Sequence, residues 1–134
     1  MDLRAQLAFF YSKLFRRPGF DISENGCKLY LGSVRSDGYC HITFTNELGT
    51  KTSISAHRAA ILVDRNSKLP RVLQASHLCN NKRCIQVHHL SLESNIINNQ
   101  RKTCFSNNMC SGHGGYPACI IQGTSFLMKI KIKK

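Results

Sequence analysis

Apolar residues recur every three or four positions at the start of the chain. This spacing places them on one face of a helix, and it predicts a helix over residues 2–16 that ends at Pro18-Gly19. The apolar face consists of Leu3, Leu7, Phe10 and Leu14.

Residues 26–54 show a different pattern, with short runs rich in β-branched and aromatic residues. Turn-forming segments at 36–38 and 46–49 separate these runs, which indicates antiparallel hairpins in one sheet of three or four strands. Ser55 is placed to cap a helix over residues 56–63, and a polar connector follows at 65–70.

The hydrophobic pattern weakens after Pro70. Residues 76–119 hold five of the seven cysteines and four of the six histidines but little aliphatic material, so something other than hydrophobic burial must hold them. A helix is expected over residues 92–102, with Glu93 in its first turn and Arg101 in its last, as the helix dipole favours. The tail after residue 126 alternates apolar and basic residues, which predicts a strand with one positive face.

The chain has 134 residues, the size of one domain, and no apolar run approaches the roughly 18 residues that a membrane span needs. Its first residues lack the pattern of a secretory signal. We therefore expect an intracellular, reducing location, in the nucleus or another DNA-containing compartment.

Charge is concentrated in the second half of the chain. The formal net charge is +12, and residues 65–134 hold eleven basic residues against the single acid Glu93. A surplus of this size attracts polyanions, so we expect double-stranded DNA as the partner, with neither a membrane nor a small-molecule substrate.

The cysteine and histidine spacing predicts two structural zinc sites. In the first, Cys79-x4-Cys84 is followed by a histidine, either His88 or His89. The remaining ligand is Cys27 or Cys40, and Cys27 is preferred because it lies where a loop enters the first strand.

The second zinc site takes three further cysteines and one histidine. Its ligands are Cys104, Cys110, His113 and Cys119. With four protein ligands at each zinc ion, no coordination position stays open for water or substrate, so both sites are structural. Cys40 is then left as a free buried thiol.

His77 is a candidate general base, because a zinc ligand two residues away would hold its imidazole in place. Hydrolysis of a phosphodiester also needs a cation to neutralise the developing charge, and Mg²⁺ held by oxygen ligands is suited to this. Asn95, Asn98 and Asn99 on the expected helix could each offer such an oxygen.

The segment 75–84, followed by His89-Leu90, Glu93-Ser94, Asn98 and Cys104, resembles the His-Cys box homing endonucleases. These belong to the ββα-metal (His-Me finger) nucleases. The resemblance implies an α+β fold in which a small irregular domain with an antiparallel sheet and a ββα-metal motif is stabilised by two structural zinc sites.

The same resemblance implies residue roles. His77 would be the general base and Asn98 the ligand of one catalytic Mg²⁺. It favours His89 in the first zinc site, and a looser similarity of residues 26–30 to HNH-type nucleases supports Cys27. The candidates for the phosphate contact are Arg35, Lys51 and Arg58.

We therefore expect a homodimeric, site-specific double-strand DNA endonuclease of the homing type. Residues 1–134 would form one zinc-stabilised nuclease domain, with a helix and DNA-binding sheet in 1–70 and the His-Cys box, active site and tail in 71–134. The alternatives are a non-catalytic, zinc-stabilised, sequence-specific DNA-binding module like the Smad amino-terminal domains, and a protein-interaction module.

The hairpins are expected to present side chains to base edges in the major groove. These residues are Lys28, Tyr30, Arg35, Tyr39 and Lys51. Further basic residues are expected to meet phosphates, adding affinity without sequence information. They are Lys82, Arg83, Arg101 and the lysines of the tail.

Overall fold

The computed structural model describes residues 1–121 and has a mixed α+β architecture. The strand expected after residue 126 lies outside the described residues. In chain order the elements are α1 (Leu3–Phe15), β1 (Phe20–Ile22), β2 (Lys28–Tyr30), β3 (His41–Thr45), β4 (Lys51–Ser55), α2 (Ala56–Arg65), β5 (Gln74–His77), the 3₁₀ turn η1 (Val87–His89), β6 (Leu90–Glu93) and α3 (Asn95–Asn107).

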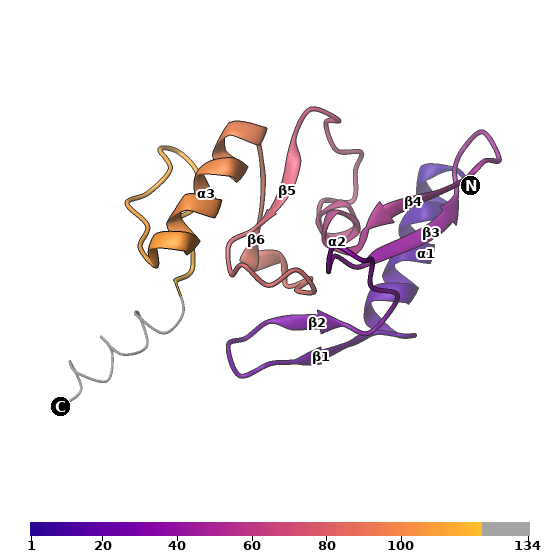
Figure 1. Cartoon of the computed structure of the whole chain (residues 1–134). Helices are drawn as coiled ribbons and strands as arrows, with labels where there is room; N and C mark the ends of the chain where they lie inside the picture. Colours follow the sequence, from indigo (N-terminus) through magenta and orange to yellow (C-terminus); the bar gives the residue numbers. More distant parts are fainter. Residues whose placement is uncertain (122–134) are drawn as a thin grey trace.

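The main hydrophobic core lies between α1, α2 and the hairpin of β3 and β4 (Figure 1). Asp2 caps α1 by accepting a hydrogen bond from the backbone N–H of Ala5 at 2.8 Å, and Phe10 and Leu14 of that helix are fully buried. Ser55 is the N-cap residue of α2, but its side chain makes no capping hydrogen bond. Both helices lie where the sequence places them.

The single sheet expected over residues 26–54 is instead divided between two two-stranded antiparallel sheets, and β5 and β6 form a third such sheet within the described residues. β1 begins at Phe20, before the predicted region, and pairs with β2, whereas β3 pairs with β4 across the turn at 46–49. Only an isolated bridge between Val34 and Cys40 forms in the segment that joins the two hairpins. That segment is short and rich in glycine and serine, so no ladder extends from β2 to β3.

β5, β6 and α3 form a ββα unit that lies beside α2 (Figure 1). The helix differs from the predicted one over residues 92–102. Leu92 and Glu93 belong to the buried strand β6, Ser94 caps the helix, and the helix continues to Asn107. Within residues 1–121, no helix is long and apolar enough to cross a membrane.

Candidate functional site

The structure brings Cys27, Cys79, Cys84 and His89 together, with their ligand atoms all within 4.8 Å of one another. His89 Nδ1 lies 3.4 Å from the sulfur of Cys27 and 3.6 Å from that of Cys84. Tetrahedral zinc with ordinary bond lengths separates a sulfur and a nitrogen ligand by about 3.6 Å. The cluster therefore fits one structural zinc ion, and among the described residues it includes neither Cys40 nor His88.

Backbone pairing explains why Cys27 joins this cluster. The segment around Cys84 bridges β2: Tyr30 N–H donates to the carbonyl of Arg83 at 2.9 Å, and Ile85 N–H donates to that of Lys28 at 2.8 Å. This pairing sets Cys27, which directly precedes β2, beside Cys84. Cys40 is equally buried but packs in the main hydrophobic core.

The thiols of the first cluster cannot all ionise without a cation. A hydrogen bond from Cys79 lowers the pKa of Cys84 to about 5. Burial raises the pKa of Cys27 to about 11, and the hydrogen bond to Cys84 raises that of Cys79. A divalent ion stabilises neighbouring thiolates directly, so this donor set is suited to zinc.

A second cluster of three cysteines and one histidine lies at the end of α3. His113 Nε2 is 3.3–3.5 Å from each of three sulfur atoms, again close to the separation in a tetrahedral zinc site. His113 Nδ1 donates to the side-chain oxygen of Gln100 at 3.0 Å, which leaves Nε2 for the metal. The sulfur ligands are those of Cys104, Cys110 and Cys119.

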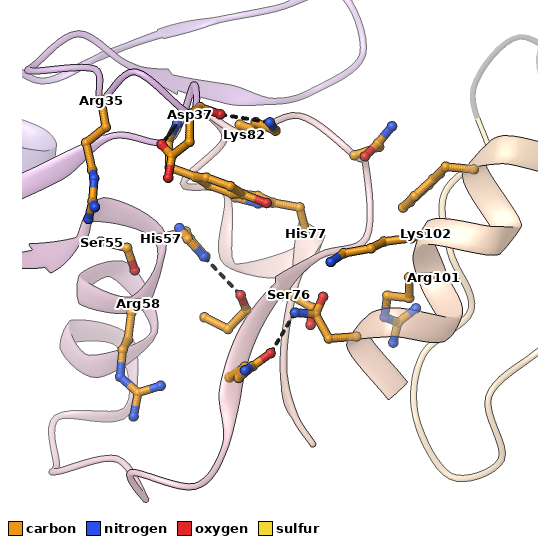
Figure 2. Close-up of a pocket in the computed structure, with 16 residues that line it drawn as sticks. Arg35, Asp37, Ser55, His57, Arg58, Ser76, His77, Lys82, Arg101 and Lys102 are labelled. Carbon is orange, nitrogen blue, oxygen red and sulfur yellow. Dashed lines mark hydrogen bonds between the residues drawn. The ribbon is translucent and has the colours of Figure 1, made fainter. Parts of the chain in front are cut away.

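A pocket of about 380 Å³ lies between the ββα unit and α2 (Figure 2). His77 from the end of β5 and Asn98 from α3 both line it, together with His57 from α2. The structure therefore brings together the two residues expected to carry catalysis, although they are 21 positions apart in the sequence.

His77 is 9% exposed, and its Nε2 lies 2.9 Å from the carbonyl oxygen of Cys84. Since a carbonyl only accepts, Nε2 carries the proton and Nδ1 keeps a lone pair. Within residues 1–121, Nδ1 has no hydrogen-bond partner. The zinc-cluster residue that fixes the imidazole is thus Cys84 and not Cys79, which lies two residues after His77 in the chain.

His57 was not singled out by sequence reasoning, yet its ring lies 4.2 Å from that of His77, centroid to centroid. His57 Nε2 donates to the carbonyl of Ala75 at 2.9 Å, while its Nδ1 is buried and has no partner among residues 1–121. Tyr39 stacks on both rings, at 5.7 and 5.9 Å. In the sequence, His57 stands out as a polar residue on the otherwise apolar face of the helix at 56–63.

Both histidines are neutral at pH 7. Burial lowers the pKa of His57 to about 4. Burial, together with the neighbouring His57, lowers the pKa of His77 to about 3. A neutral imidazole keeps a lone pair that can accept a proton from water, as a general base must, but the burial that lowers its pKa also makes it a weaker base than a free imidazole.

Asn98 offers an oxygen to this pocket. Its Nδ2 donates to the side-chain oxygen of Gln74 at 2.8 Å, and its own carbonyl oxygen accepts no hydrogen bond from the described residues. Amide oxygens are among the ligands that Mg²⁺ accepts alongside water and phosphate. Asn95 and Asn99 do not line the pocket.

Five cationic residues line the pocket, but most of them are already engaged. Arg58 donates to the carbonyls of Leu73 and Pro70 at 2.6 and 2.8 Å. Lys82 donates to a backbone carbonyl, and Arg101 to a carboxylate. Within residues 1–121, the side chains of the other two make no ion pair or hydrogen bond. These are Arg35 and Lys102.

A comparison with protein families matches residues 28–124 to the zinc-binding loop region of homing endonucleases. The chain belongs to this family. The homing-endonuclease match covers both Cys/His clusters except Cys27, and it includes His77 and Asn98. Family membership supports a nuclease and DNA-binding role for the chain. A search of the curated proteins finds no match.

Two residues that were expected to contact DNA are buried in this homing-endonuclease domain, and a third is partly engaged in a hydrogen bond. Tyr30 is 2% exposed and packs in the core, so the prediction that it reaches base edges is wrong. Arg83 is half-buried, and its Nη2 donates to the carbonyl of Tyr30 at 3.0 Å. Arg101 is 1% exposed, which excludes the expected phosphate contact.

The remaining DNA-contact candidates occupy different environments. Lys28 lies over the rings of Phe15 and Phe20, at 5.9 and 5.2 Å from their centroids. Tyr39 packs on the histidine pair rather than standing free. The exposed candidates are Arg35, Lys51 and Lys82. Of these three, Lys51 does not line the pocket.

Proposed function

We propose that the chain is a site-specific endonuclease of the homing type that hydrolyses phosphodiester bonds of double-stranded DNA with Mg²⁺. The observation that carries this proposal is that His77 and Asn98 line the same pocket. The imidazole of His77 is neutral, and its Nδ1 has no hydrogen-bond partner among the described residues. A proton acceptor, an oxygen ligand and cationic side chains are what hydrolysis of a phosphodiester requires.

The proton transfer is assigned to His77. The carbonyl of Cys84 holds the ring through Nε2–H, so that Nδ1 takes the proton as the water oxygen attacks phosphorus. The imidazolium that forms donates at both ring nitrogens, and Cys84 continues to accept at one of them. Attack opposite the 3′ oxygen breaks the bond between phosphorus and that oxygen, which takes a proton from solvent, so the products carry a 5′-phosphate and a 3′-hydroxyl.

The carbonyl oxygen of Asn98 is assigned as the protein ligand of Mg²⁺. When bound, this ion neutralises negative charge on the phosphate and on the leaving oxygen. Gln74 holds the amide of Asn98 so that its oxygen, not its nitrogen, is available for this role.

Lys102 is assigned to the phosphate contact, with Arg35 as the second pocket cation. Lys102 lies one helical turn after Asn98, on the same side of α3. Figure 2 shows its side chain extending from α3 toward the middle of the pocket, whereas Arg58 points away from it. Lys51 is exposed and lies outside the pocket, so we assign it to phosphates farther from the bond that is cleaved.

Replacing Lys102 with alanine is expected to remove one phosphate contact. The slope of log binding constant against log salt concentration should become less steep by about 0.9, and cleavage at saturating DNA should slow roughly 10²-fold. Filter binding between 50 and 200 mM salt and single-turnover cleavage measure the two effects. Lys68→Ala is the control, because Lys68 is exposed and pairs with Glu47. An unchanged salt slope and rate for Lys102→Ala would remove this assignment.

A homodimer is proposed because one pocket per chain meets only one DNA strand at a time. A pair of chains related by a two-fold axis presents two pockets to the two antiparallel strands. The proposed location remains an intracellular, reducing compartment that contains DNA.

The proposed function is tested by incubating the zinc-loaded protein with supercoiled plasmid carrying fragments of its host genome, with and without Mg²⁺. Nicked and then linear DNA should form only with Mg²⁺. Retention of plasmid in a gel shift without any break, at any Mg²⁺ concentration, would instead indicate the non-catalytic DNA-binding module.

A further inference from the structure

Arg101 is a fully buried cation on α3 that contacts two other parts of the chain. Its Nε and Nη2 donate to the two carboxylate oxygens of Glu93 on β6, at 2.6 and 2.7 Å. Its Nη1 donates to the sulfur of Cys119 at 3.3 Å. One guanidinium therefore joins α3 to the ββ hairpin and to a ligand of the second zinc cluster.

The same hairpin holds Asn98. Glu93 and Gln74 are directly opposite partners in the β5–β6 pair, and Gln74 accepts the hydrogen bond from the Asn98 amide. Because Arg101 follows Asn98 by three residues on α3, the helix is tied to adjacent positions of both strands. The position of the Asn98 oxygen thus depends on the ion pair between Arg101 and Glu93.

Cys119 is itself held close to the end of β5 by a backbone hydrogen bond of its neighbour. The next residue, Ile120, donates its backbone N–H to the carbonyl of Leu78 at 2.7 Å, and Leu78 directly follows His77. The segment that carries Cys119 is therefore hydrogen-bonded to the end of β5. The hydrogen bond from Arg101 to Cys119 therefore connects α3 to the segment that is bound to the end of β5.

We propose that Arg101 is a positioning residue that couples the second zinc site to the pocket. Zinc held by Cys119 would fix the sulfur that accepts the hydrogen bond from Arg101 Nη1, and Arg101 in turn is bound to Glu93 on β6. Zinc binding then strengthens the attachment of α3 and with it the placement of the Asn98 oxygen. The coupling is reciprocal, so a divalent ion in the pocket also increases the affinity of the second site for zinc. This inference rests on the proposed role of Asn98.

The test uses a variant that removes both buried charges at nearly constant volume, Glu93→Leu with Arg101→Met. Removing Arg101 alone would leave Glu93 buried and unpaired, which destabilises a fold strongly. The full-length, zinc-loaded protein is used for two measurements. Zinc release into a chromogenic chelator reports on the clusters, and Mn²⁺ binding followed by electron paramagnetic resonance reports on the pocket.

Two zinc ions per chain should still bind to the variant, but one of them should be released at least about tenfold faster. The dissociation constant for pocket Mn²⁺ should rise about tenfold. Pocket binding is defined as the Mn²⁺ signal that disappears in Asn98→Ala. Ser106→Ala, at an exposed position of the same helix, should match the wild type in both measurements.

If the double variant, Glu93→Leu with Arg101→Met, gives wild-type values in either measurement, the proposed coupling is wrong. If the double variant does not fold, Arg101→Lys gives the same test, because it keeps a cation beside Glu93 but cannot reach both partners. If the wild-type protein itself binds no Mn²⁺ in the pocket, the proposed function is rejected. That result differs from a loss of Mn²⁺ binding in the variant alone, which supports the coupling.

Discussion

Replacing His77 with alanine is expected to slow DNA cleavage by roughly 10²- to 10⁴-fold, the range that a positioned general base contributes. Alanine removes the lone pair that takes the proton from water, and no other residue of the described pocket offers an equivalent one. His57 is the nearest imidazole, but its free nitrogen is buried. DNA binding should change little, because His77 is largely buried and uncharged at pH 7.

Single-turnover cleavage and gel shifts on the same DNA measure the two quantities. His88→Ala is the matched control, since His88 is an exposed histidine on η1 that lies outside the pocket and, among the described residues, outside the zinc clusters. Zinc content must be two ions per chain in both variants, because the hydrogen bond from His77 ends on a zinc-cluster residue. Cleavage by His77→Ala at the wild-type rate, with zinc intact, would refute the base assignment.

Both zinc-ligand sets could be derived from the sequence because most of their members are close along the chain. Spacing alone confines Cys79, Cys84 and a following histidine to one loop. The distant ligand needed a further argument, and the position of Cys27 before the first predicted strand favoured it over Cys40. The structure supports that choice, since β2 pairs with the Cys84 segment.

The surroundings of His77 could not be predicted in the same way. The stack of Tyr39, His57 and His77 joins a turn, a helix and a strand that the sequence separates by up to 38 positions. No local spacing reports a contact of that kind. The polar lining of the pocket therefore became visible only once α2 and β5 were placed side by side.

The charges of α3 show why a local rule gave the wrong answer. The helix dipole favours an acid in the first turn and a base in the last by about 0.3–1 kcal/mol each. Separating a buried ion pair costs about 3–5 kcal/mol, because it leaves an unpaired charge in the core. Glu93 and Arg101 therefore follow the larger effect, with Glu93 on β6 before the helix and Arg101 directed inward.

Cys27→Ala is expected to release one of the two zinc ions and to unfold the first half of the His-Cys box. Structural zinc contributes about 10–16 kcal/mol of apparent binding free energy in small metal-dependent folds. The net stability of a whole domain is about 5–15 kcal/mol. Loss of this site should therefore leave the domain unfolded at ordinary growth temperatures, so that no cooperative transition appears on heating. Zinc per chain by mass spectrometry and circular dichroism melting measure both consequences.

Cys40→Ala is the matched control, because both thiols are 1% exposed and the substitution removes the same atom. In the core, a lost sulfur leaves only a small cavity, and such substitutions cost about 0.5–3 kcal/mol. For a domain of this size, about 1 kcal/mol lowers the melting temperature by a few degrees. Two zinc ions should remain. The reverse outcome, with Cys40→Ala losing zinc and Cys27→Ala retaining it, would exchange the two assignments, because burial does not distinguish the two thiols and the choice rests on the position of Cys27 beside His89 and Cys84.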